Sequence, residues 1–213
     1  KWYVCIVVLA TLAIGLNIWS MYDSFGDALR YSSFQVVSII TTTGYATADF
    51  NLWPTFSKMI LFFLMVVGAC AGSTGGGLKV TRLMILLKKI KLNIQKLWHP
   101  KKVEAITIDG KIVEKEIVDQ SLAFFCAWMI IITVGTLIVS LDNFDFETTL
   151  TSVYTCLGNV GPGLGLCGPT GSFAMFSVLS KIVLSFCMLL GRLEIYPILI
   201  FLFPLMELRR KSG

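Results

Sequence analysis

Charged side chains are scarce in this chain of 213 residues, in which Asp, Glu, Lys and Arg together account for 15% of the sequence. Soluble domains carry about 25%. Histidine occurs once, as His99 beside Pro100 in a basic stretch, where a surface turn is the favoured interpretation. No acid–base pair, nucleophile–base set or cluster of metal ligands occurs at matching depths within the long apolar stretches described below. The sequence therefore predicts that the protein is not an enzyme.

Paired cysteines are missing as well. The six cysteines include no C-x-x-C pair, and five of them lie in apolar segments, where cysteine behaves as a small hydrophobic residue. The sequence predicts neither a disulfide framework nor a metal site. No signal peptide is recognisable, and the chain begins inside an apolar run, which suggests a segment of something longer.

Long apolar blocks dominate what is present. Hydrophobic residues make up 55% of the chain, and its mean hydropathy is +0.78. A helix that crosses a bilayer needs about 20 apolar residues. We expect such stretches at residues 2–21, 55–71, 121–141 and 173–206. These lengths exceed those of soluble core helices, so the pattern predicts a polytopic membrane protein.

Two shorter apolar segments lie between these stretches. The first is expected to be a helix over residues 28–40 followed by extended backbone, and the second is expected to be a helix that ends at Gly158. Aligning Gly44 with Gly158 without a gap places Ser38 on Ser152. A duplicated order of span, short re-entrant segment and span is typical of ion-conducting pores.

Basic residues are concentrated in the middle of the chain. Ten of the eighteen lie between Lys79 and Lys115, and a further cluster covers residues 209–211. Such clusters mark the cytoplasmic side of a membrane. The loops that hold the short helices carry mainly Asp and Glu, with Arg30 as the exception, so both short helices are expected to enter from the outer face as parallel repeats. No aromatic interleaving accompanies the basic residues, so nucleic acid is not an expected partner.

The basic middle divides the chain into three expected parts. Residues 1–91 form a span–pore loop–broken span repeat, residues 92–119 a cytoplasmic linker, and residues 120–213 a second repeat. Asp109 and Gly110 lie between alternating residues in the linker, which is a strong hairpin signal. The predicted fold class is an all-α polytopic membrane protein with two parallel span–pore-helix–span repeats of potassium-channel type and a small cytoplasmic β-hairpin between them.

The run TTTGYA at residues 41–46 is a candidate ion filter. Gly44 permits backbone conformations that other residues resist, so that successive carbonyl groups can face a cation. Short helices that enter from the outer face also point their partly negative C-terminal ends toward the bilayer centre. A loop that merely packs between helices is the alternative for one copy, and the second copy favours a filter.

Two features are candidates for a gate. Arg192 lies at membrane depth, where an arginine costs at least ~2.5 kcal/mol, so we expect it to face the conduction path. An ion pair with Glu194 is the structural alternative, although residues two apart on a helix point to different faces. Glycines interrupt the second span over residues 68–77, either as a collapsible plug or as a flexible boundary between helices.

Four motifs in this order resemble the TrkH family, the ion-translocating subunits of bacterial Trk-type potassium uptake systems, within the broader Trk/Ktr/HKT superfamily. They are TTTGYATADF at 41–50, ACAGSTGGGLK at 69–79, NVGPGLG at 159–165 and GRLE at 191–194. Together they span most of the chain. Proteins of this family carry four repeats around one pore, and this chain resembles the third and fourth.

The resemblance implies a role for each motif. The implied filter positions are Thr42, Thr43, Gly44, Tyr45, Ala46, Cys156, Leu157, Gly158, Asn159 and Val160. Potassium would be held by backbone carbonyls near Thr43, Gly44, Leu157 and Gly158. The implied gate consists of Gly68, Gly72, Ser73, Thr74, Gly75, Gly76, Gly77 and Arg192.

The resemblance also implies partners and a location. We expect a multi-pass protein in the lipid of the bacterial cytoplasmic (inner) membrane, with the basic linker and the C-terminus in the cytoplasm. The N-terminal half would supply two further filter loops, and the subunit would form a homodimer. A TrkA-like nucleotide-binding regulatory ring would dock at residues 88–115, so this chain itself is expected to hold no cofactor.

The function that these expectations indicate is potassium uptake through a filter of backbone carbonyls, gated by the glycine-rich loop and Arg192. Channel-like movement and coupled symport both stay open. A sodium-permeable or poorly selective transporter of the same fold is one alternative, and glycine at positions 44 and 158 argues against it. A non-conducting scaffold for the cytoplasmic ring is another.

Overall fold

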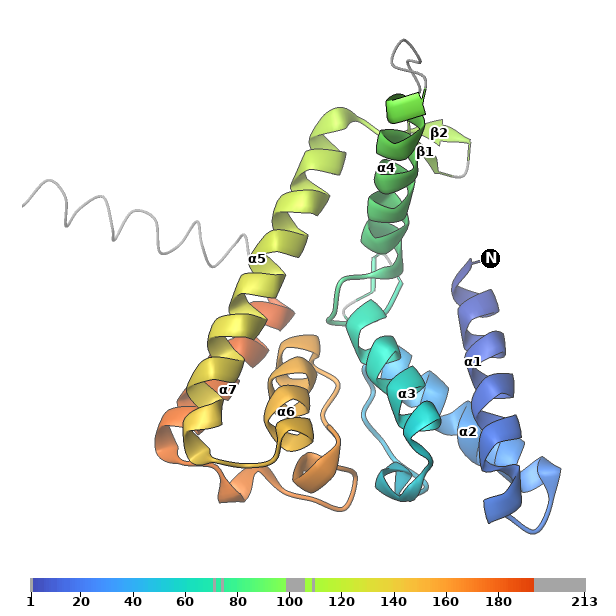
Figure 1. The fold of residues 1–213 in the computed structure, drawn as a ribbon, viewed down its shortest axis with the longest axis vertical. Helices are drawn as coiled ribbons and strands as arrows, with labels where there is room; N and C mark the ends of the chain where they lie inside the picture. The colour runs from blue at the N-terminus through green and yellow to red at the C-terminus, as the bar shows by residue number, and fades with distance from the viewer. Residues whose placement is uncertain (1, 71, 74, 99–105, 109, 194–213) are drawn as a thin grey trace, which may run out of the picture.

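The computed structural model describes residues 2–70, 72–73, 75–98, 106–108 and 110–193. These residues form a helical chain with one small hairpin (Figure 1). The α-helices are α1 (Trp2–Ile18), α2 (Phe25–Ile40), α3 (Thr55–Val67), α4 (Val80–Trp98), α5 (Lys115–Val139), α6 (Phe146–Gly158) and α7 (Val178–Arg192). Short 3-10 turns are η1 (Trp19–Met21), η2 (Phe50–Leu52), η3 (Ser140–Asp142), η4 (Gly165–Cys167) and η5 (Phe173–Met175), and the strands are β1 (Thr107–Ile108) and β2 (Lys111–Ile112).

Two continuous helical stretches are long and apolar enough to cross a membrane, Trp2–Met21 and Lys115–Asp142. Only 17% and 28% of their most apolar windows are buried within the described residues. The core helix of a soluble protein would be mostly buried, so these helices present their apolar side chains to lipid or to another protein. Both predicted spans are therefore present as helices.

The expected helix over residues 55–71 is shorter than predicted. α3 ends at Val67 because Gly68 adopts a left-handed conformation with φ of +68°. α4, by contrast, continues seven residues past residue 91, where the first of the three expected parts ends, and stops at Trp98. The glycine-rich interruption thus begins at Gly68, directly after α3, as the predicted range of residues 68–77 has it.

Capping side chains explain two other differences at helix ends. α2 begins at Phe25, three residues before the predicted start, because the side chain of Ser24 accepts a hydrogen bond from the Asp27 amide at 3.1 Å. α7 begins at Val178 rather than at 173, because Ser177 accepts from the Ser180 amide at 3.2 Å. The part of the predicted last helix beyond residue 193 lies outside the described residues.

The helices form two groups that lie side by side (Figure 1). α1, α2 and α3 surround one hydrophobic core, and α5, α6 and α7 surround another. Val160 and Leu164, which follow α6 in sequence, are buried in the core of the first group. The loop after α6 therefore joins the two groups.

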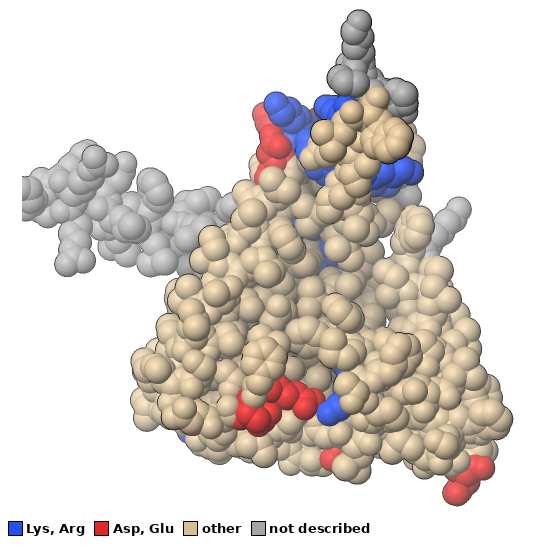
Figure 2. Space-filling model, viewed as in Figure 1, with Lys and Arg blue, Asp and Glu red and all other residues tan. Residues whose placement is uncertain are grey.

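The hairpin and α4 lie together at one end of the molecule (Figure 1). The strands pair Thr107 with Ile112, as the Asp-Gly signal predicted, and Ile106 packs with Ile85 and Val118. Figure 2 shows Lys and Arg mainly at this end, Asp and Glu mainly at the opposite end, and a broad surface without charge between them. This separation is the one expected of a chain that crosses a membrane.

Candidate functional site

α2 and α6 end with the same pattern of backbone hydrogen bonds. The Thr43 amide donates to the carbonyl of Ser38 at 2.9 Å, and the Val160 amide donates to the carbonyl of Thr155 at 3.0 Å. In each case the residue just before the donor is left-handed, Thr42 with φ of 58° and Asn159 with φ of 52°. This is the geometry of a helix closed by a left-handed cap.

The side chains at these ends correspond too. The Ser38 hydroxyl donates to the carbonyl of Tyr45 at 2.6 Å, and the Thr155 hydroxyl donates to the carbonyl of Pro162 at 3.1 Å. Each bond ties the last turn of a helix to the chain that leaves it. Ser38 is therefore the structural counterpart of Thr155.

This correspondence corrects the alignment of Gly44 with Gly158. Gly158 is the last residue of α6, whereas Gly44 lies beyond the end of α2. The residue that matches Gly44 is Gly161, because both follow the left-handed cap by two positions and both have positive φ, 80° and 107°. The gap-free alignment was wrong by three residues. It placed Ser38 on Ser152 because both carry hydroxyl groups, but the sequence does not show where each helix ends.

The loops that follow the two helices are in contact. A Cβ atom on Gly44 would overlap the carbonyl oxygen of Val160 and would lie 3.2 Å from Cδ of Pro162. Gly161 also faces Gly44, because a Cβ on Gly161 would lie 3.8 Å from the Gly44 Cα. Glycine is required at position 44 for this close approach of two backbones.

A cavity of about 430 Å³ lies beside both loops. Its lining includes Thr42, Thr43, Asn159, Val160, Gly161 and Lys181. Lys181 is held by a hydrogen bond from its ammonium group to the carbonyl of Ala174 at 2.7 Å. Five predicted filter residues from the two helix groups thus line one cavity: Thr42, Thr43, Cys156, Asn159 and Val160.

The carbonyls of two other predicted filter residues lie close to glycines of neighbouring segments. The carbonyl of Leu157 lies against Gly191 of α7, and the carbonyl of Gly158 lies against Gly76, both so closely that a Cβ on either glycine would overlap it. Cys156, with Leu157, is buried inside α6. Tyr45, in contrast, is 73% exposed, and Ala46 is exposed beside it. The Val160 carbonyl is approached as closely by Gly44, so these contacts do not exclude ion binding, and ion ligands near Leu157 and Gly158 stay a prediction.

The glycine-rich loop packs directly against the ends of α2 and α6. In addition to the contact of Gly76 with Gly158, a Cβ on Gly75 would lie 3.0 Å from Oγ1 of Thr42. Gly72 faces open space, and the neighbouring Ser73 donates its hydroxyl to the carbonyl of Cys70 at 2.8 Å. Thr74 lies outside the described residues.

The base of this loop is closed by backbone contacts. The Leu78 amide donates to the carbonyl of Val66 at 3.2 Å, and the Val80 amide donates to the carbonyl of Ala69 at the same distance. Gly68 and Gly77 cross so closely that a Cβ on Gly77 would lie 2.9 Å from the Gly68 Cα. Only glycines permit this crossing.

Arg192 is the last residue of α7, and its side chain is exposed. The helix before it is fixed to the end of α6, because the Asn159 side-chain amide donates to the carbonyl of Met188 at 3.1 Å and Gly191 touches Leu157. Arg192 therefore directly follows Gly191, the residue through which α7 contacts α6. Glu194, its predicted alternative partner, lies outside the described residues.

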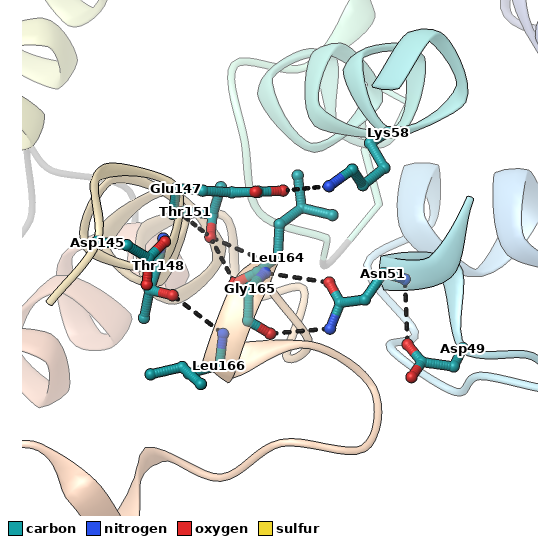
Figure 3. Close-up of polar contacts among 10 residues, drawn as sticks. All are labelled: Asp49, Asn51, Lys58, Asp145, Glu147, Thr148, Thr151, Leu164, Gly165 and Leu166. Atoms are coloured by element: carbon teal, nitrogen blue, oxygen red, sulfur yellow. Dashed lines mark hydrogen bonds and ion pairs between the residues drawn. The ribbon is translucent and has the colours of Figure 1, made fainter. Parts of the chain in front are cut away.

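A network of polar contacts joins the two helix groups on their acidic side (Figure 3). Lys58 of α3 forms an ion pair with Glu147 of α6 at 2.9 Å. Asn51 forms two hydrogen bonds with Gly165, one through each atom of its side-chain amide. Asn51 is not among the residues that the sequence marks as functional, because nothing around it indicates a partner more than a hundred residues away.

The first turn of α6 belongs to the same network (Figure 3). Asp145 caps the helix by accepting a hydrogen bond from the Thr148 amide at 2.9 Å. Burial raises the pKa of Asp145, but its hydrogen bonds, chiefly from Thr148, outweigh this and hold the pKa below its ordinary value of 3.8. Thr151 accepts from the backbone amide of Leu164 at 2.9 Å, and its hydroxyl donates to the nearer carbonyl, that of Glu147, at 2.8 Å.

Comparison with known proteins assigns this chain to a family. Residues 3–210 match the sequence profile of the family described as TrkH, cation transport protein. The chain belongs to the TrkH family. This family is one of transporters rather than enzymes by its description, and the helical fold agrees with that class.

Several curated TrkH proteins are similar to this chain. The Trk system potassium uptake protein TrkH of Salmonella typhimurium is 35% identical over 199 residues, which cover 93% of this chain and 40% of that protein. The protein of the same name from Vibrio parahaemolyticus is 38% identical over 185 residues, covering 87% of this chain and 37% of that protein. The chain thus spans about two fifths of the length of these relatives.

A solved TrkH structure has the same arrangement of helices. The crystal structure of the potassium transporter TrkH from Vibrio parahaemolyticus superposes with a TM-score of 0.83 at 36% sequence identity. The match covers 94% of this chain and 43% of the other. The fold is therefore that of a part of a TrkH protein.

Proposed function

We propose that this chain forms one half of a potassium pathway across the bacterial cytoplasmic membrane. The observation that carries the proposal is the structural equivalence of the two helix ends, at which Gly44 and Gly161 follow the same left-handed cap and lie against each other. Two such loops facing one space supply backbone carbonyls from two sides. The potassium uptake proteins that this chain resembles support the choice of ion.

The filter in this proposal consists of the chain that follows each cap. It comprises Thr43, Gly44 and Tyr45 after α2, and Val160, Gly161 and Pro162 after α6. Glycine with positive φ lets successive carbonyls turn toward one axis, and two helix C-termini add partial negative charge that favours a cation. α2 and α6 thereby act as the pore helices of two parallel span–pore-helix–span repeats.

The gate in this proposal consists of the glycine-rich loop and Arg192. The contacts of Gly75 with Thr42 and of Gly76 with Gly158 support a plug directly against the two helix ends. Small residues let such a loop move without displacing large side chains. Arg192 adds a positive charge next to the same helix end, where it would oppose the passage of cations.

The rest of the pathway would come from other chains or segments. Two loops cannot enclose an ion on four sides, so an N-terminal half like that of the longer relatives would complete the filter. The charge separation in Figure 2 supports a cytoplasmic position for α4 and the hairpin. A homodimer in the membrane and a TrkA-like regulatory ring that docks on this basic end complete the proposed assembly.

Tracer uptake tests the proposal. The chain is reconstituted into proteoliposomes alone and together with the N-terminal half of one of its longer relatives, and uptake of radioactive rubidium is measured with potassium or sodium as competitor. We expect uptake only when both halves are present, with strong competition by potassium and weak competition by sodium. Equal competition by the two ions would instead favour the sodium-permeable alternative. Absence of uptake with folded protein would favour a non-conducting scaffold.

A further inference from the structure

Asn51 joins the loop that contains Gly44 to the loop that contains Gly161, through both the oxygen and the nitrogen of its side-chain amide (Figure 3). These two segments are called the glycine loops below. The Nδ2 atom of Asn51 donates to the carbonyl of Gly165 at 2.8 Å, and its Oδ1 accepts from the amide of Gly165 at 3.0 Å. A side chain of one helix group thus pairs with both backbone groups of one residue in the other. No other residue type of this size offers a donor and an acceptor in one plane.

The surrounding glycines fit closely around this amide. A Cβ on Gly168 would overlap the Nδ2 atom of Asn51 and would lie 2.6 Å from its Cγ. A Cβ on Gly165, whose φ is +64°, would overlap the hydroxyl of Thr148. The pocket for the Asn51 side chain therefore has no room for displacement.

Both sides of the contact are held from behind. The Asp49 carboxylate accepts from the backbone N–H of Asn51 at 3.0 Å and from the hydroxyl of Thr170 at 3.2 Å. On the other side, the Leu166 amide donates to the hydroxyl of Thr148 at 3.0 Å, in the first turn of α6. The pair is thus anchored in two elements, the turn η2 and the helix α6.

The contact lies a short distance along the chain from both proposed filter segments. Asn51 follows Gly44 by seven residues, and Gly165 follows Gly161 by four. The stretch between Gly161 and Gly165 is also fixed, because the Leu164 amide donates to the hydroxyl of Thr151 at 2.9 Å. We expect a displacement at Asn51 to shift the carbonyls beside Gly161 most directly, because only one fixed residue lies between them and the contact.

From these contacts we infer that Asn51 is a positioning residue for ion selectivity: it sets the spacing between the two glycine loops and so the fit of the filter to potassium. The inference rests on the proposed function. Asn51 would touch no ion, and it would act through the backbone that it holds. The nearby ion pair of Lys58 and Glu147 also joins the groups, but its side chains bond to each other and not to the loop backbone.

Two substitutions at Asn51 test the inference in the two-half assembly described above. Asn51→Asp retains the acceptor for the Gly165 amide and replaces the donor with an oxygen that repels the Gly165 carbonyl. Asn51→Leu removes both hydrogen bonds at nearly constant size. We expect sodium to compete with rubidium about tenfold more strongly in each variant, because a hydrogen bond of this kind is worth about tenfold in an equilibrium.

A third variant leaves Asn51 in place. Gly168 has φ of −64°, so Gly168→Ala introduces no backbone strain, yet its Cβ would displace the Asn51 amide. We expect the same increase in sodium competition. Lys58→Met is the matched control, because it removes a contact between the same two groups without touching either loop, and its competition ratio should equal that of the unmodified protein.

The outcomes separate the inference from the proposed function. Sodium competition that rises in the Asn51 and Gly168 variants but not in Lys58→Met supports the inference. Rubidium uptake that falls equally with either competitor, at an unchanged potassium-to-sodium ratio, overturns it and leaves the potassium pathway in place. Absence of uptake by the unmodified assembly overturns the proposed function and, with it, the inference. Amide hydrogen exchange at Gly165 that is no faster in Asn51→Leu than in the unmodified protein also overturns the inference, whatever the uptake.

Discussion

Gly44 lies against the carbonyl oxygen of Val160 so closely that any side chain at position 44 would overlap it. The contact joins two loops that follow equivalent helix ends, one in each helix group. Because the same backbone is proposed to hold the ion, packing and ion selectivity depend on the same atoms. Substitutions in either loop are therefore expected to change both.

Substitution of glycines distinguishes the structural pairing of Gly44 with Gly161 from the gap-free pairing of Gly44 with Gly158. Gly161→Ala should reduce selective rubidium uptake strongly, because alanine with a φ of 107° is strained by roughly 1–2 kcal/mol and the strain falls on a proposed filter carbonyl. Gly158→Ala should be much milder, since its Cβ would meet no atom closer than 3.3 Å. Uptake with sodium competition measures both. The reverse ranking would restore Gly158 as the filter glycine.

Gly76→Ala should increase uptake. A Cβ at this position would overlap the Gly158 carbonyl, so the glycine-rich loop has to move away from the helix end and unblock the path. Gly72→Ala is the control, because a Cβ there meets nothing within 4 Å and adds only the strain of its φ of +79°. Initial rates of rubidium uptake at matched protein content give the comparison. Equal rates for the two variants would argue against the plug.

Arg192→Ala should raise flux or leak, because it removes both the charge and the bulk proposed to oppose cations. Arg192→Lys keeps the charge and should remain close to the unmodified rate. The increase should be largest at low ionic strength, where charges are least screened. Rubidium efflux from loaded vesicles measures the leak. Unchanged flux in Arg192→Ala at normal expression would remove Arg192 from the gate.

The pKa of Asp145 predicts a dependence of stability on pH. Since its pKa is lowered in the folded protein, the ionised carboxyl contributes stability above its ordinary value of 3.8, and this is lost as the pH falls through the lower folded value. Asp145→Asn keeps a capping oxygen without the charge. The difference in melting temperature between the two proteins in detergent should therefore be present at pH 6 and shrink below about pH 4. A difference that is constant with pH would contradict the assignment.

Asp145→Ala separates the cap from the charge. It removes the acceptor for the Thr148 amide altogether, which typically costs about 1 kcal/mol. We expect its melting temperature to lie below that of Asp145→Asn at every pH. This comparison serves as the control for the pH experiment, because loss of the cap alone does not vary with pH.

Much of the architecture could be predicted from local sequence. The apolar stretches over residues 2–21 and 121–141, the hairpin at Asp109 and the end of α6 at Gly158 follow from composition and from single turn residues. The shorter α3 could not be predicted with the same success, because apolar residues continue past Val67 and only the conformation of Gly68 ends the helix.

The sequence by itself determined a helical membrane protein, its membership of the TrkH family and the motifs that carry its candidate site. These follow from hydrophobic length and residue order, which are local properties. Only the tertiary structure decided that Gly161 matches Gly44, that Gly44 lies against Val160, and that Asn51 holds Gly165. Each of these depends on contacts between residues far apart in the chain, where one backbone approaches another, and no local pattern records that distance.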